Sequence, residues 1–365
     1  MNEKPIILIL GKLPPPLMGP AIATQIILNS KLKEEFQLVH LDTRMNKEVA
    51  TMGRWSFSKM IRSIAIYFEF ISLVREHQPD VVLVPISQTT MGFLKDAPFI
   101  WLGKFLGKKV LIQLRGSNFK NWLNSAAGLV NRFVKITLKK CVGVIVLGNN
   151  LKHLFYDYFD EEQIYVVPNG ANYQLEKREE KELMLLYLAN FLPTKSFDDV
   201  LKATVILKEK GITNFKLKAA GAWDNESFKT TCLALIKKHQ LINVELLPPQ
   251  SGKEKMQLFA DAAIFVFCPK MPEGHPWVIV EAMANGLPII ATDQGAIIES
   301  VKEGGNGFIV PPEQPAAIAE KLEQLLNDEE LRKQMVTKSS EYYQSNFTEE
   351  KMVQNLAGVF RKVLK

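Results

Sequence analysis

At 365 residues the chain exceeds a single ordinary core and is the right length for two domains of roughly 150 to 180 residues each. Its composition, 47% hydrophobic and 23% charged, excludes fibrous, disordered and membrane-spanning proteins. The net charge of +6 is concentrated in residues 1–170, where 21 basic side chains oppose 13 acidic ones, against 24 and 26 in the remainder. A basic first half predicts contact with something anionic, such as a nucleic acid, a membrane surface or a phosphorylated lipid.

The chain begins with an apolar run, IILIL at 6–10, that is shorter than the core of a signal peptide and far shorter than a membrane span. We interpret it as a first buried strand. The three cysteines, Cys141, Cys232 and Cys268, are far apart and form no CxxC pair, so neither a disulfide framework nor a zinc site is expected. These features favour a cytoplasmic protein.

Short apolar runs alternate with helical stretches through the first half of the chain. The runs interpreted as strands are IILIL at 6–10, QLVHL at 37–41, VVLVP at 81–85, VLIQL at 110–114, VIVLG at 144–148 and IYVVPNG at 164–170. Helices are expected from about residue 21, near 56–77, through WLGKFLG, and as one long helix over SNFKNWLNSAAGLVNRFVKITLKK. Because this alternation is typical of parallel βαβ units, residues 1–173 are predicted to form a Rossmann-like domain.

A polar stretch without apolar periodicity, QLEKREEK at 174–181, predicts a linker. The alternation then repeats, so residues 182–345 are predicted to form a second Rossmann-like domain. A last helix within 346–365 is expected to cross back to the first domain. The predicted fold class is therefore α/β, with two doubly wound parallel-sheet domains facing one another across a cleft.

The segment from Glu273 to Glu281, EGHPWVIVE, carries the strongest chemical signal. It follows the predicted strand AIFVF, and Pro276 suits the first position of a helix that ends before Gly286. In a fully helical segment the two carboxylates would lie about 12 Å apart and face the same way. Glycosidase carboxylate pairs lie roughly 5 to 9.5 Å apart, so Glu273 and Glu281 are better interpreted as hydroxyl acceptors at two ends of one ligand.

The N-terminus of this predicted helix offers backbone N–H groups and a positive dipole end to a diphosphate between the two carboxylates. The next turn, Asp293-Gln294-Gly295 leading into AIIES, predicts a second helix end beside it. The alternative is that E-x7-E is a chance spacing and that Glu281 is a solvated helix residue.

The whole string EGHPWVIVEAMANGLPIIATDQGAIIESV closely resembles the E-x7-E signature of the retaining family 4 glycosyltransferases, which have the GT-B fold. The resemblance implies a nucleotide-sugar donor domain at 182–345 and an acceptor domain at 1–173. It assigns the ribose hydroxyls to Glu281 and the transferred sugar to Glu273. The remaining donor contacts that it implies in this part of the chain are Gly274, His275, Trp277, Val278 and Gly295.

The same family places a pair of cations on the diphosphate at the start of the second domain. Here Lys195 matches one of them, whereas Asn190 stands where an arginine is expected. Arg115, in LRGSN, occupies a loop in which relatives often carry a histidine, and it could supply the missing charge. Lys195 as a solvated loop lysine is the alternative. The expected catalytic residues are thus Glu273, Lys195 and Arg115.

The stretch PPPLMGPA at 14–21 resembles the Gly-rich loop after the first strand, with Gly19 as its donor contact. An ordinary turn between a strand and a helix is the alternative. The sequence contains no DxD motif, so metal-independent transfer with no cofactor is expected. The resemblance implies retention of configuration, a hexose-type sugar on UDP or GDP, and a glycan or lipid-linked acceptor in cell-surface polysaccharide biosynthesis.

The stretch RWSFSKMIRSIAIYFEFISLVR shows an apolar stripe at 57, 60, 61, 64, 68, 71 and 74, which we expect to face the core. Exposed aromatic and basic residues in this half could rest on an anionic membrane, at the cytoplasmic face of the inner membrane. Nucleic acid is not expected because no reader motif is present. Two alternatives stay open, which are a nucleotide-sugar epimerase and a non-catalytic nucleotide-sugar-binding partner of another transferase.

Overall fold

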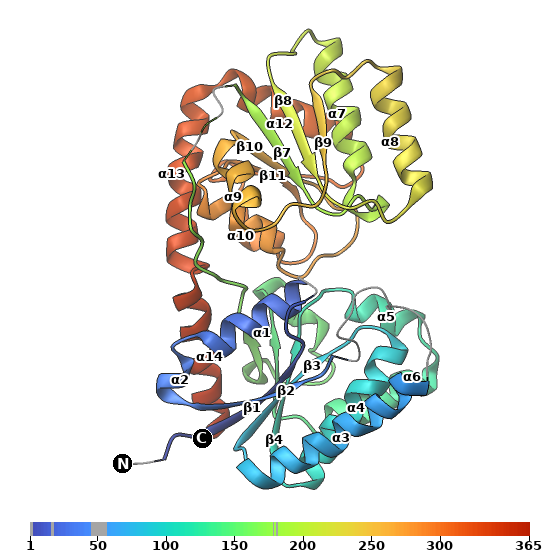
Figure 1. Cartoon of the computed structure of the whole chain (residues 1–365), viewed down its shortest axis with the longest axis vertical. Helices are drawn as coiled ribbons and strands as arrows, with labels where there is room; N and C mark the ends of the chain where they lie inside the picture. Colours follow the sequence, from blue (N-terminus) through green and yellow to red (C-terminus); the bar gives the residue numbers. More distant parts are fainter. Residues whose placement is uncertain (1–2, 16–17, 45–56, 178, 180–181) are drawn as a thin grey trace. The chain divides into compact units, whose positions relative to one another are not determined.

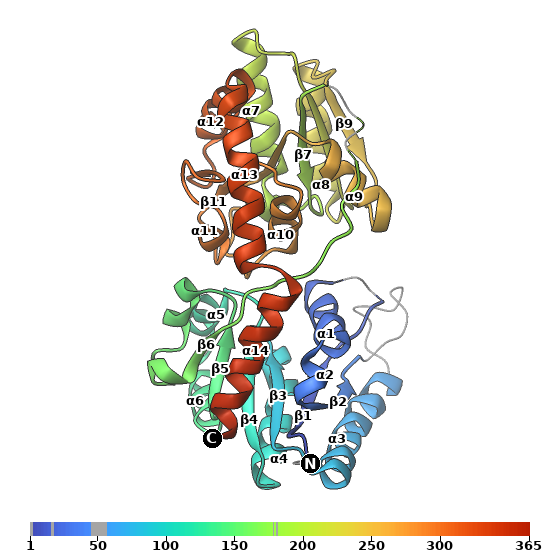
Figure 2. The same cartoon turned by 90° about the vertical axis from the view of Figure 1, so that its left-hand side faces the viewer.

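The computed structural model describes residues 3–15, 18–44, 57–177, 179 and 182–365, without the side chains of 57–63. The chain divides into two compact units, one formed by residues 1–169 with 349–365 and the other by residues 170–348. Figures 1 and 2 show that each unit consists of a sheet with helices on both faces. The linker predicted at 174–181 lies partly outside the described residues.

The first unit is built on a parallel sheet in the order β2-β1-β3-β4-β5-β6. The strands are β1 (Ile6–Gly11), β2 (Gln37–Asp42), β3 (Val81–Ile86), β4 (Lys109–Leu114), β5 (Gly143–Val146) and β6 (Ile164–Val166). Apart from the edge strands β2 and β6, these runs are mostly buried, as expected for strands covered on both faces.

Helices cover both faces of this sheet. They are α1 (Gly19–Asn29), α2 (Leu32–Glu35), α3 (Phe57–His77), α4 (Thr90–Phe105), α5 (Phe119–Ser125), α6 (Gly128–Leu138) and α14 (Glu349–Leu364), with 3-10 turns η2 (Asn149–Leu154) and η3 (Glu161–Gln163). Helix α14 packs Leu356 and Phe360 against Ile7, Ile9 and Val81 of the sheet. Figure 1 shows α3, α4 and α6 on the other side of the sheet from α14.

Two predictions about these helices were wrong. The single long helix expected over 117–140 is divided into α5 and α6, because Ala126 and Ala127 adopt extended backbone conformations between them. The stripe predicted to face the core from α3 is wrong in part. Ile64 and Phe68 of that stripe are 50% and 67% exposed, whereas its Val74 is buried, as are Ile66 and Phe70 outside it. The side chains at 57, 60 and 61 lie outside the described residues.

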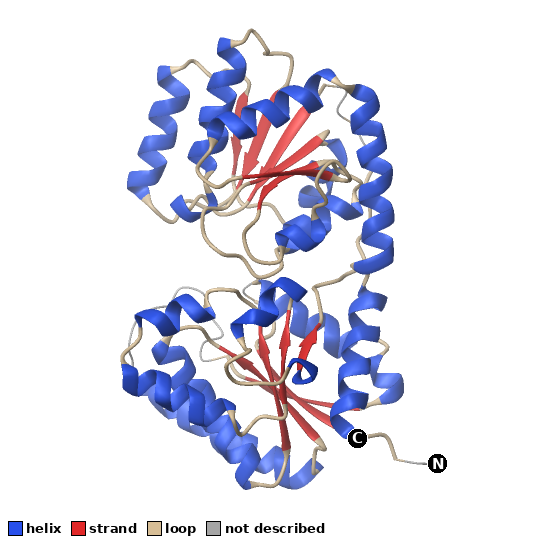
Figure 3. Cartoon of the chain, turned by 180° about the vertical axis from the view of Figure 1, so that it is seen from behind, coloured by secondary structure: helices blue, strands red, loops and turns tan. Residues whose placement is uncertain are grey.

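The second unit repeats the architecture with a parallel sheet in the order β12-β11-β10-β7-β8-β9. Its strands are β7 (Met184–Leu188), β8 (Lys216–Ala220), β9 (Val244–Leu247), β10 (Ile264–Phe267), β11 (Ile289–Thr292) and β12 (Gly307–Val310). Figure 3 shows both sheets enclosed by helices, which confirms the predicted α/β class with two doubly wound parallel sheets.

The helices of the second unit divide between the two faces of its sheet. They are η4 (Pro193–Lys195), α7 (Phe197–Glu209), α8 (Glu226–Lys238), α9 (Gly252–Asp261), α10 (Trp277–Ala284), α11 (Ile297–Ser300), α12 (Pro315–Asn327) and α13 (Glu329–Asn346). Buried side chains of α7, α8 and α12 form one core, and those of α9 and α10 form the other. Helix α13 contributes Met335 to the first core and Tyr343 to the second.

Candidate functional site

The strand order of the second sheet reverses between β10 and β7, which are hydrogen-bonded neighbours. From β7 the chain continues to β8 on one side, and from β10 it continues to β11 on the other. In open α/β sheets, ligands bind outside the carboxyl ends of the strands at such a switch point. The loop after β7 carries Asn190 and Lys195, and the loop after β10 carries Glu273.

Lys195 and Glu273 meet at this switch point. The Lys195 ammonium donates a short hydrogen bond to Glu273 Oε1, and both side chains are partly buried, at 24% and 19% exposed. The lysine nitrogen also lies 5.4 Å from the centroid of the Phe267 ring at the end of β10. The structure therefore joins two of the three predicted catalytic residues, although they are 78 positions apart in the sequence.

Glu281 lies inside α10 and is almost completely buried. Its side chain is 9% exposed, and Oε1 accepts a hydrogen bond of 2.5 Å from the Lys255 ammonium of α9. Its other oxygen, Oε2, is buried and has no hydrogen-bond partner among the described residues. An unsatisfied buried carboxylate oxygen is costly, and ligand hydroxyl groups would satisfy it.

Helix α10 begins immediately after the loop that carries Glu273. Pro276 occupies the N-cap with ψ of 129°, so the helix starts at Trp277, one residue later than predicted. The first-turn N–H groups of a helix have no acceptor within the helix, so Trp277 and Val278 present a turn that suits an anion. Gly286, with φ of +69°, follows the C-cap in the predicted left-handed conformation.

The loops after β10 and β11 approach each other closely at Gly295. A Cβ atom added to Gly295 would overlap the Glu273 carbonyl group, and the φ of +62° already favours glycine. The Ala296 N–H donates to the Gly274 carbonyl at 2.9 Å. Gly274 and Gly295 therefore position the backbone of Glu273.

The second helix end predicted after Gly295 is not a comparable anion site. Helix α11 is only four residues long, from Ile297 to Ser300. The backbone is left-handed at Gly295, before this helix, and extended at Val301, after it. Few peptide dipoles therefore align along the helix axis.

The side chain of His275 is buried and packs in the core of the second unit. The imidazole is 4% exposed, its Nε2 lies 2.7 Å from Ser300 Oγ, and its ring packs on Phe347 at 5.0 Å between centroids. Burial lowers the pKa of His275 to about 4, so the ring is neutral near pH 7. The prediction that its backbone contacts a donor phosphate is not altered by this packing.

Asn190 contacts the loop that follows β8. Its Oδ1 accepts from the Ala222 N–H and its Nδ2 donates to Asp224, both at 3.4 Å. The amide therefore supports this loop at the edge of the sheet where a donor is expected.

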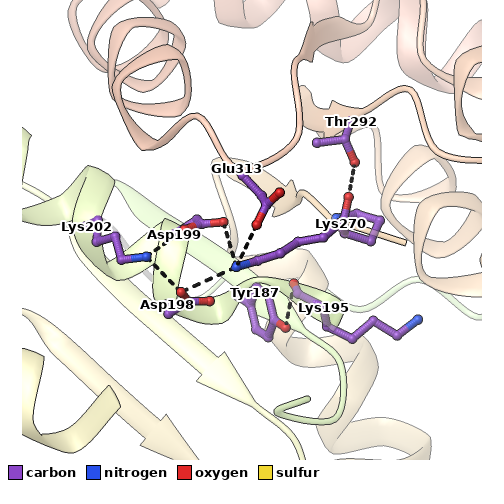
Figure 4. A network of polar contacts seen from close by, with 9 residues as sticks. Tyr187, Lys195, Asp198, Asp199, Lys202, Lys270, Thr292 and Glu313 are labelled. Atoms are coloured by element: carbon purple, nitrogen blue, oxygen red, sulfur yellow. Dashed lines mark hydrogen bonds and ion pairs between the residues drawn. The ribbon is translucent and has the colours of Figure 1, made fainter. Parts of the chain in front are cut away.

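A second polar cluster, shown in Figure 4, lies next to Lys195 and includes residues that sequence reasoning missed. Lys270, in the loop after β10, forms ion pairs with Asp198 and Asp199 in the first turn of α7. No sequence signal selects these partners. Lys255, the partner of Glu281, was missed for the same reason, since nothing in the sequence of α9 distinguishes it from its neighbour Lys253.

Arg115 and Gly19 belong to the first unit. Arg115 directly follows β4, and its Nη1 donates to Asn169 Oδ1 at 3.1 Å. Burial lowers the pKa of Arg115 to about 10, which leaves it cationic near pH 7. Gly19 begins α1 after β1, and the order of this sheet reverses between β1 and β3. Both residues thus follow the carboxyl ends of strands. Their roles toward a substrate stay predictions.

Comparison with known proteins finds similarity to glycosyltransferases. Residues 172–342 match the family model of glycosyl transferases group 1. An uncharacterized glycosyltransferase of Methanocaldococcus jannaschii, MJ1178, is 28% identical over 253 residues, which are 69% of this chain and 68% of the relative. The fold and these matches support an enzyme, a glycosyltransferase with the GT-B fold.

Two further relatives of this glycosyltransferase have more specific names. The capsular polysaccharide biosynthesis glycosyltransferase CapM of Staphylococcus aureus is 26% identical over 63% of this chain and 64% of its own length. N-acetyl-alpha-D-glucosaminyl L-malate synthase of Bacillus anthracis is 28% identical over 58% of this chain and 53% of its own length. The match therefore spans between about half and two thirds of these two relatives.

Solved structures of the same fold cover nearly the whole glycosyltransferase. Sucrose-phosphate synthase from Thermosynechococcus elongatus superposes with a TM-score of 0.77 at 15% identity and covers 99% of both chains. Anabaena Alr3699/HepE in complex with UDP and glucose superposes with a TM-score of 0.73 at 14% identity, over 98% of this chain and 99% of that one. At such identities the likeness establishes the fold alone.

Two properties of the described residues complete this picture. Within the described ranges, no group of three or more His, Cys, Asp or Glu side chains is arranged to hold a metal ion. None of the helices there combines the length and apolar character needed to cross a membrane.

Proposed function

We propose that this glycosyltransferase moves a hexose-type sugar from a UDP- or GDP-linked donor to a glycan or lipid-linked acceptor in cell-surface polysaccharide biosynthesis. The observation that carries the donor half is Glu281, whose buried Oε2 has no partner in the described part of the chain. Ribose hydroxyl groups would supply the missing donors. The name of CapM supports an acceptor in polysaccharide biosynthesis, and that of the Bacillus anthracis synthase supports transfer of a glucosaminyl group.

The remaining donor groups follow from the same geometry. A diphosphate at the first turn of α10 would lie beside Lys195. The Lys195 ammonium would then pair with the phosphate oxygens in place of the Glu273 carboxylate. The freed Glu273 carboxylate would then accept hydroxyl hydrogen bonds from the sugar. Arg115 and Gly19 are proposed to act from the first unit toward the reacting sugar and the acceptor.

We propose transfer with retention and without a metal ion. The acceptor oxygen attacks the anomeric carbon on the face that the leaving group occupies. The bond from that carbon to the donor phosphate oxygen breaks, and the acceptor proton passes to a phosphate oxygen. Lys195 and the α10 N-terminus would stabilise the charge that develops on the diphosphate, as preorganised donors do in electrostatic catalysis.

A donor panel tests this proposal directly. Thermal shift with UDP-glucose, UDP-galactose, UDP-N-acetylglucosamine and GDP-mannose should identify one base and sugar, because a ligand at a hundred times its Kd adds about 2.7 kcal/mol of stability. With that donor and a membrane or glycan extract, nucleoside diphosphate release should require Glu273, and Glu273→Ala should abolish it. Release should persist in EDTA, and NMR of the product should show the donor's anomeric configuration.

Three outcomes would contradict the proposal. Epimerised free sugar formed without acceptor would indicate an epimerase. Tight donor binding without nucleotide release in any extract would indicate a non-catalytic partner. Loss of release in EDTA that Mg²⁺ or Mn²⁺ restores would contradict the metal-independent mechanism.

The acceptor side of the proposal includes an anionic membrane surface. Eight large apolar side chains are exposed on three helices, of which α4 packs against both α3 and α6. They are Ile64, Phe68, Met91, Leu94, Trp101, Phe105, Leu129 and Ile136. Phe105 and Leu129 are the most exposed, at 87% and 83%.

The charge of this face complements anionic lipid. On α4 and α6 the exposed side chains of Lys95, Lys104, Arg132 and Lys135 are basic, against one acidic residue, the half-buried Asp96. On α6, Leu129, Arg132, Ile136 and Lys139 recur at helical spacing and are all exposed. Apolar side chains interleaved with basic ones are typical of a surface that lies in a membrane interface.

Vesicle binding tests this surface separately from the donor site. We expect sedimentation with vesicles rich in phosphatidylglycerol but not with pure phosphatidylcholine, and weaker binding in high salt. The double variant Phe105→Ser, Leu129→Ser should weaken binding at least tenfold. Ile242→Ser, at a 96% exposed position in the second unit, is the matched control. Equal binding by both variants would contradict the proposed face.

A further inference from the structure

Two carboxylates are buried side by side at the start of α7. Asp198 and Asp199 are 9% and 3% exposed, and they lie two and three positions after the left-handed residue Ser196, with φ of 59°. Lys202, one turn further along α7, donates to both at 2.8 and 2.9 Å. Buried carboxylates require cations or hydrogen-bond donors, and one lysine does not satisfy four oxygen atoms.

The second cation comes from a different element. Lys270 lies in the loop after β10, three residues before Glu273. Its ammonium is 3.5 Å from Asp198 Oδ2 and 3.3 Å from Asp199 Oδ2, and its side chain is 23% exposed. Exposed Glu313 lies at 3.8 Å on the other side. Figure 4 shows Lys270 reaching across to α7 beside Lys195.

One main-chain hydrogen bond connects the same two loops, and side chains of β11 and β7 bind the backbone of each. The Lys270 N–H donates to the Thr194 carbonyl at 2.9 Å, one residue before Lys195. The Thr292 hydroxyl donates to the Pro269 carbonyl at 2.7 Å, and the Tyr187 hydroxyl donates to the Lys195 carbonyl at 3.2 Å. The loop of Glu273 and the turn of Lys195 are thus held together at both main chain and side chain.

We propose that Lys270 is a positioning residue for sugar transfer. Its ion pairs with Asp198 and Asp199 hold the Glu273 loop against the start of α7, which fixes Glu273 relative to Lys195. Among the described residues, the Lys270 side chain forms no ion pair with Lys195 or Glu273. It therefore acts on them through the two loops. This inference rests on the proposed donor roles of Lys195 and Glu273.

Lys202 provides a matched control because it binds the same two aspartates at shorter distances. It belongs to α7 itself, so it makes no connection to the Glu273 loop. A purely structural role for these ion pairs predicts that Lys202→Met damages the protein at least as much as Lys270→Met. A positioning role predicts that only Lys270→Met impairs transfer beyond its effect on stability.

The first experiment compares the two variants in transfer, with the best-bound sugar nucleotide of the panel, well below both melting temperatures. Lys270→Met should lower kcat by about 10- to 100-fold, as small displacements of reacting groups do. Its KM for the donor should change less than threefold, because Glu281 and α10 are untouched. Lys202→Met should keep kcat within threefold. Lys270→Gln replaces Lys270→Met if the latter does not fold.

The second experiment needs no donor. Amide hydrogen exchange of a peptide spanning 268–276 should be at least tenfold faster in Lys270→Met than in wild type, and unchanged in Lys202→Met. Unchanged exchange in both variants, or equal losses of kcat in both, would overturn the inference. If wild type transfers no sugar, the proposed function fails, and the exchange comparison still decides whether Lys270 holds the loop.

Discussion

Glu281 and Glu273 are each paired with a lysine from another element, but they differ in burial. The Glu281 side chain is 9% exposed and that of Glu273 is 19% exposed. The more buried carboxylate has the stronger need for its partners, because hydrogen bonds to charged groups contribute about 1.5 to 3 kcal/mol. Removing the charge of Glu281 should therefore weaken the binding of the groups that contact it.

Glu281→Gln should weaken binding of the nucleoside diphosphate by about 10- to 100-fold, because a neutral amide is a poorer acceptor for ribose hydroxyl groups. Isothermal calorimetry with UDP and GDP measures this loss. Glu323→Gln is the control, since Glu323 forms a surface pair with Lys210 at 2.5 Å. Wild-type affinity in Glu281→Gln would exclude the proposed ribose contact.

His275 should make stability depend on pH. Its pKa is about 4 in the folded protein because the ring is buried, against 6.5 for an exposed ring. As the pH falls below 6.5, the unfolded chain binds the proton before the folded protein does. The contribution of His275 to stability is therefore fully present above pH 6.5 and is lost progressively between pH 6.5 and 4.

From pH 7 to pH 5, wild type should lose about 2 kcal/mol more stability than His275→Asn. Urea unfolding at the two pH values measures the difference. His153→Asn, at an exposed position, should retain the wild-type pH dependence. Identical pH dependence in wild type and His275→Asn would show that the ring accepts a proton in the folded state.

At this scale the sequence predicted the residues with a spacing signal and missed those without one. Glu273 and Glu281 were found because E-x7-E sits between a strand and helix caps that can be read locally. Lys255 and Lys270 were not, since their partners are 26 positions away in one case and more than 70 in the other. Which lysine reaches which carboxylate depends on strand order, which local patterns do not encode.

At the scale of elements, the contact between the loops after β10 and β11 requires a residue without a side chain, Gly295. Gly295→Ala should displace the Glu273 backbone and reduce kcat/KM by at least 100-fold. Gly304→Ala is a matched control, because Gly304 also has a left-handed φ, of +65°, but nothing lies within 4 Å of an added Cβ.

Both alanine variants should lose about 1 to 2 kcal/mol of unfolding free energy, because alanine is strained in the left-handed conformation. Only Gly295→Ala should lose transfer activity in addition. Melting temperatures and initial rates, measured on the same samples, separate the two effects. Full activity in Gly295→Ala would mean that the loops tolerate a shift of Glu273.

Element types were predictable where apolar periodicity is strong and failed where it is weak. Helix α13 was not predicted because it is polar on most of its surface and buries only Met335, Ser339 and Tyr343, at a spacing of four. The break between α5 and α6 was missed because alanine, a strong helix former, occupies both extended positions. On α3 the apolar residues cover more than one face, so periodicity alone did not select the buried one.

At the scale of the whole molecule, the last helix completes the core of the first unit. Phe360 of α14 is fully buried and packs edge-to-face on Phe36 at 5.6 Å. Phe360→Ala should therefore destabilise the first unit by about 3 to 5 kcal/mol. Calorimetry should show a lower melting transition for this unit.

Arg361→Ala is the control for that substitution. Arg361 neighbours Phe360 but forms a solvent-exposed pair with Glu35, so its loss should change the transition much less. Equal shifts in the two variants would contradict a core role for α14. The alternation of strands and helices predicted both sheets, but it could not specify the strand order, which depends on contacts distant in sequence.

The pairing of Lys195 with Glu273 and of Lys255 with Glu281 gives the site no net charge from these four side chains. A donor that binds as proposed replaces Glu273 with phosphate beside Lys195, whereas its ribose hydroxyl groups add to Lys255 as partners of Glu281. Inorganic phosphate could take Lys195 but would leave Glu273 without a cation. By the proposed contacts, the resting site would favour ligands that carry both an anion and hydroxyl groups over inorganic phosphate.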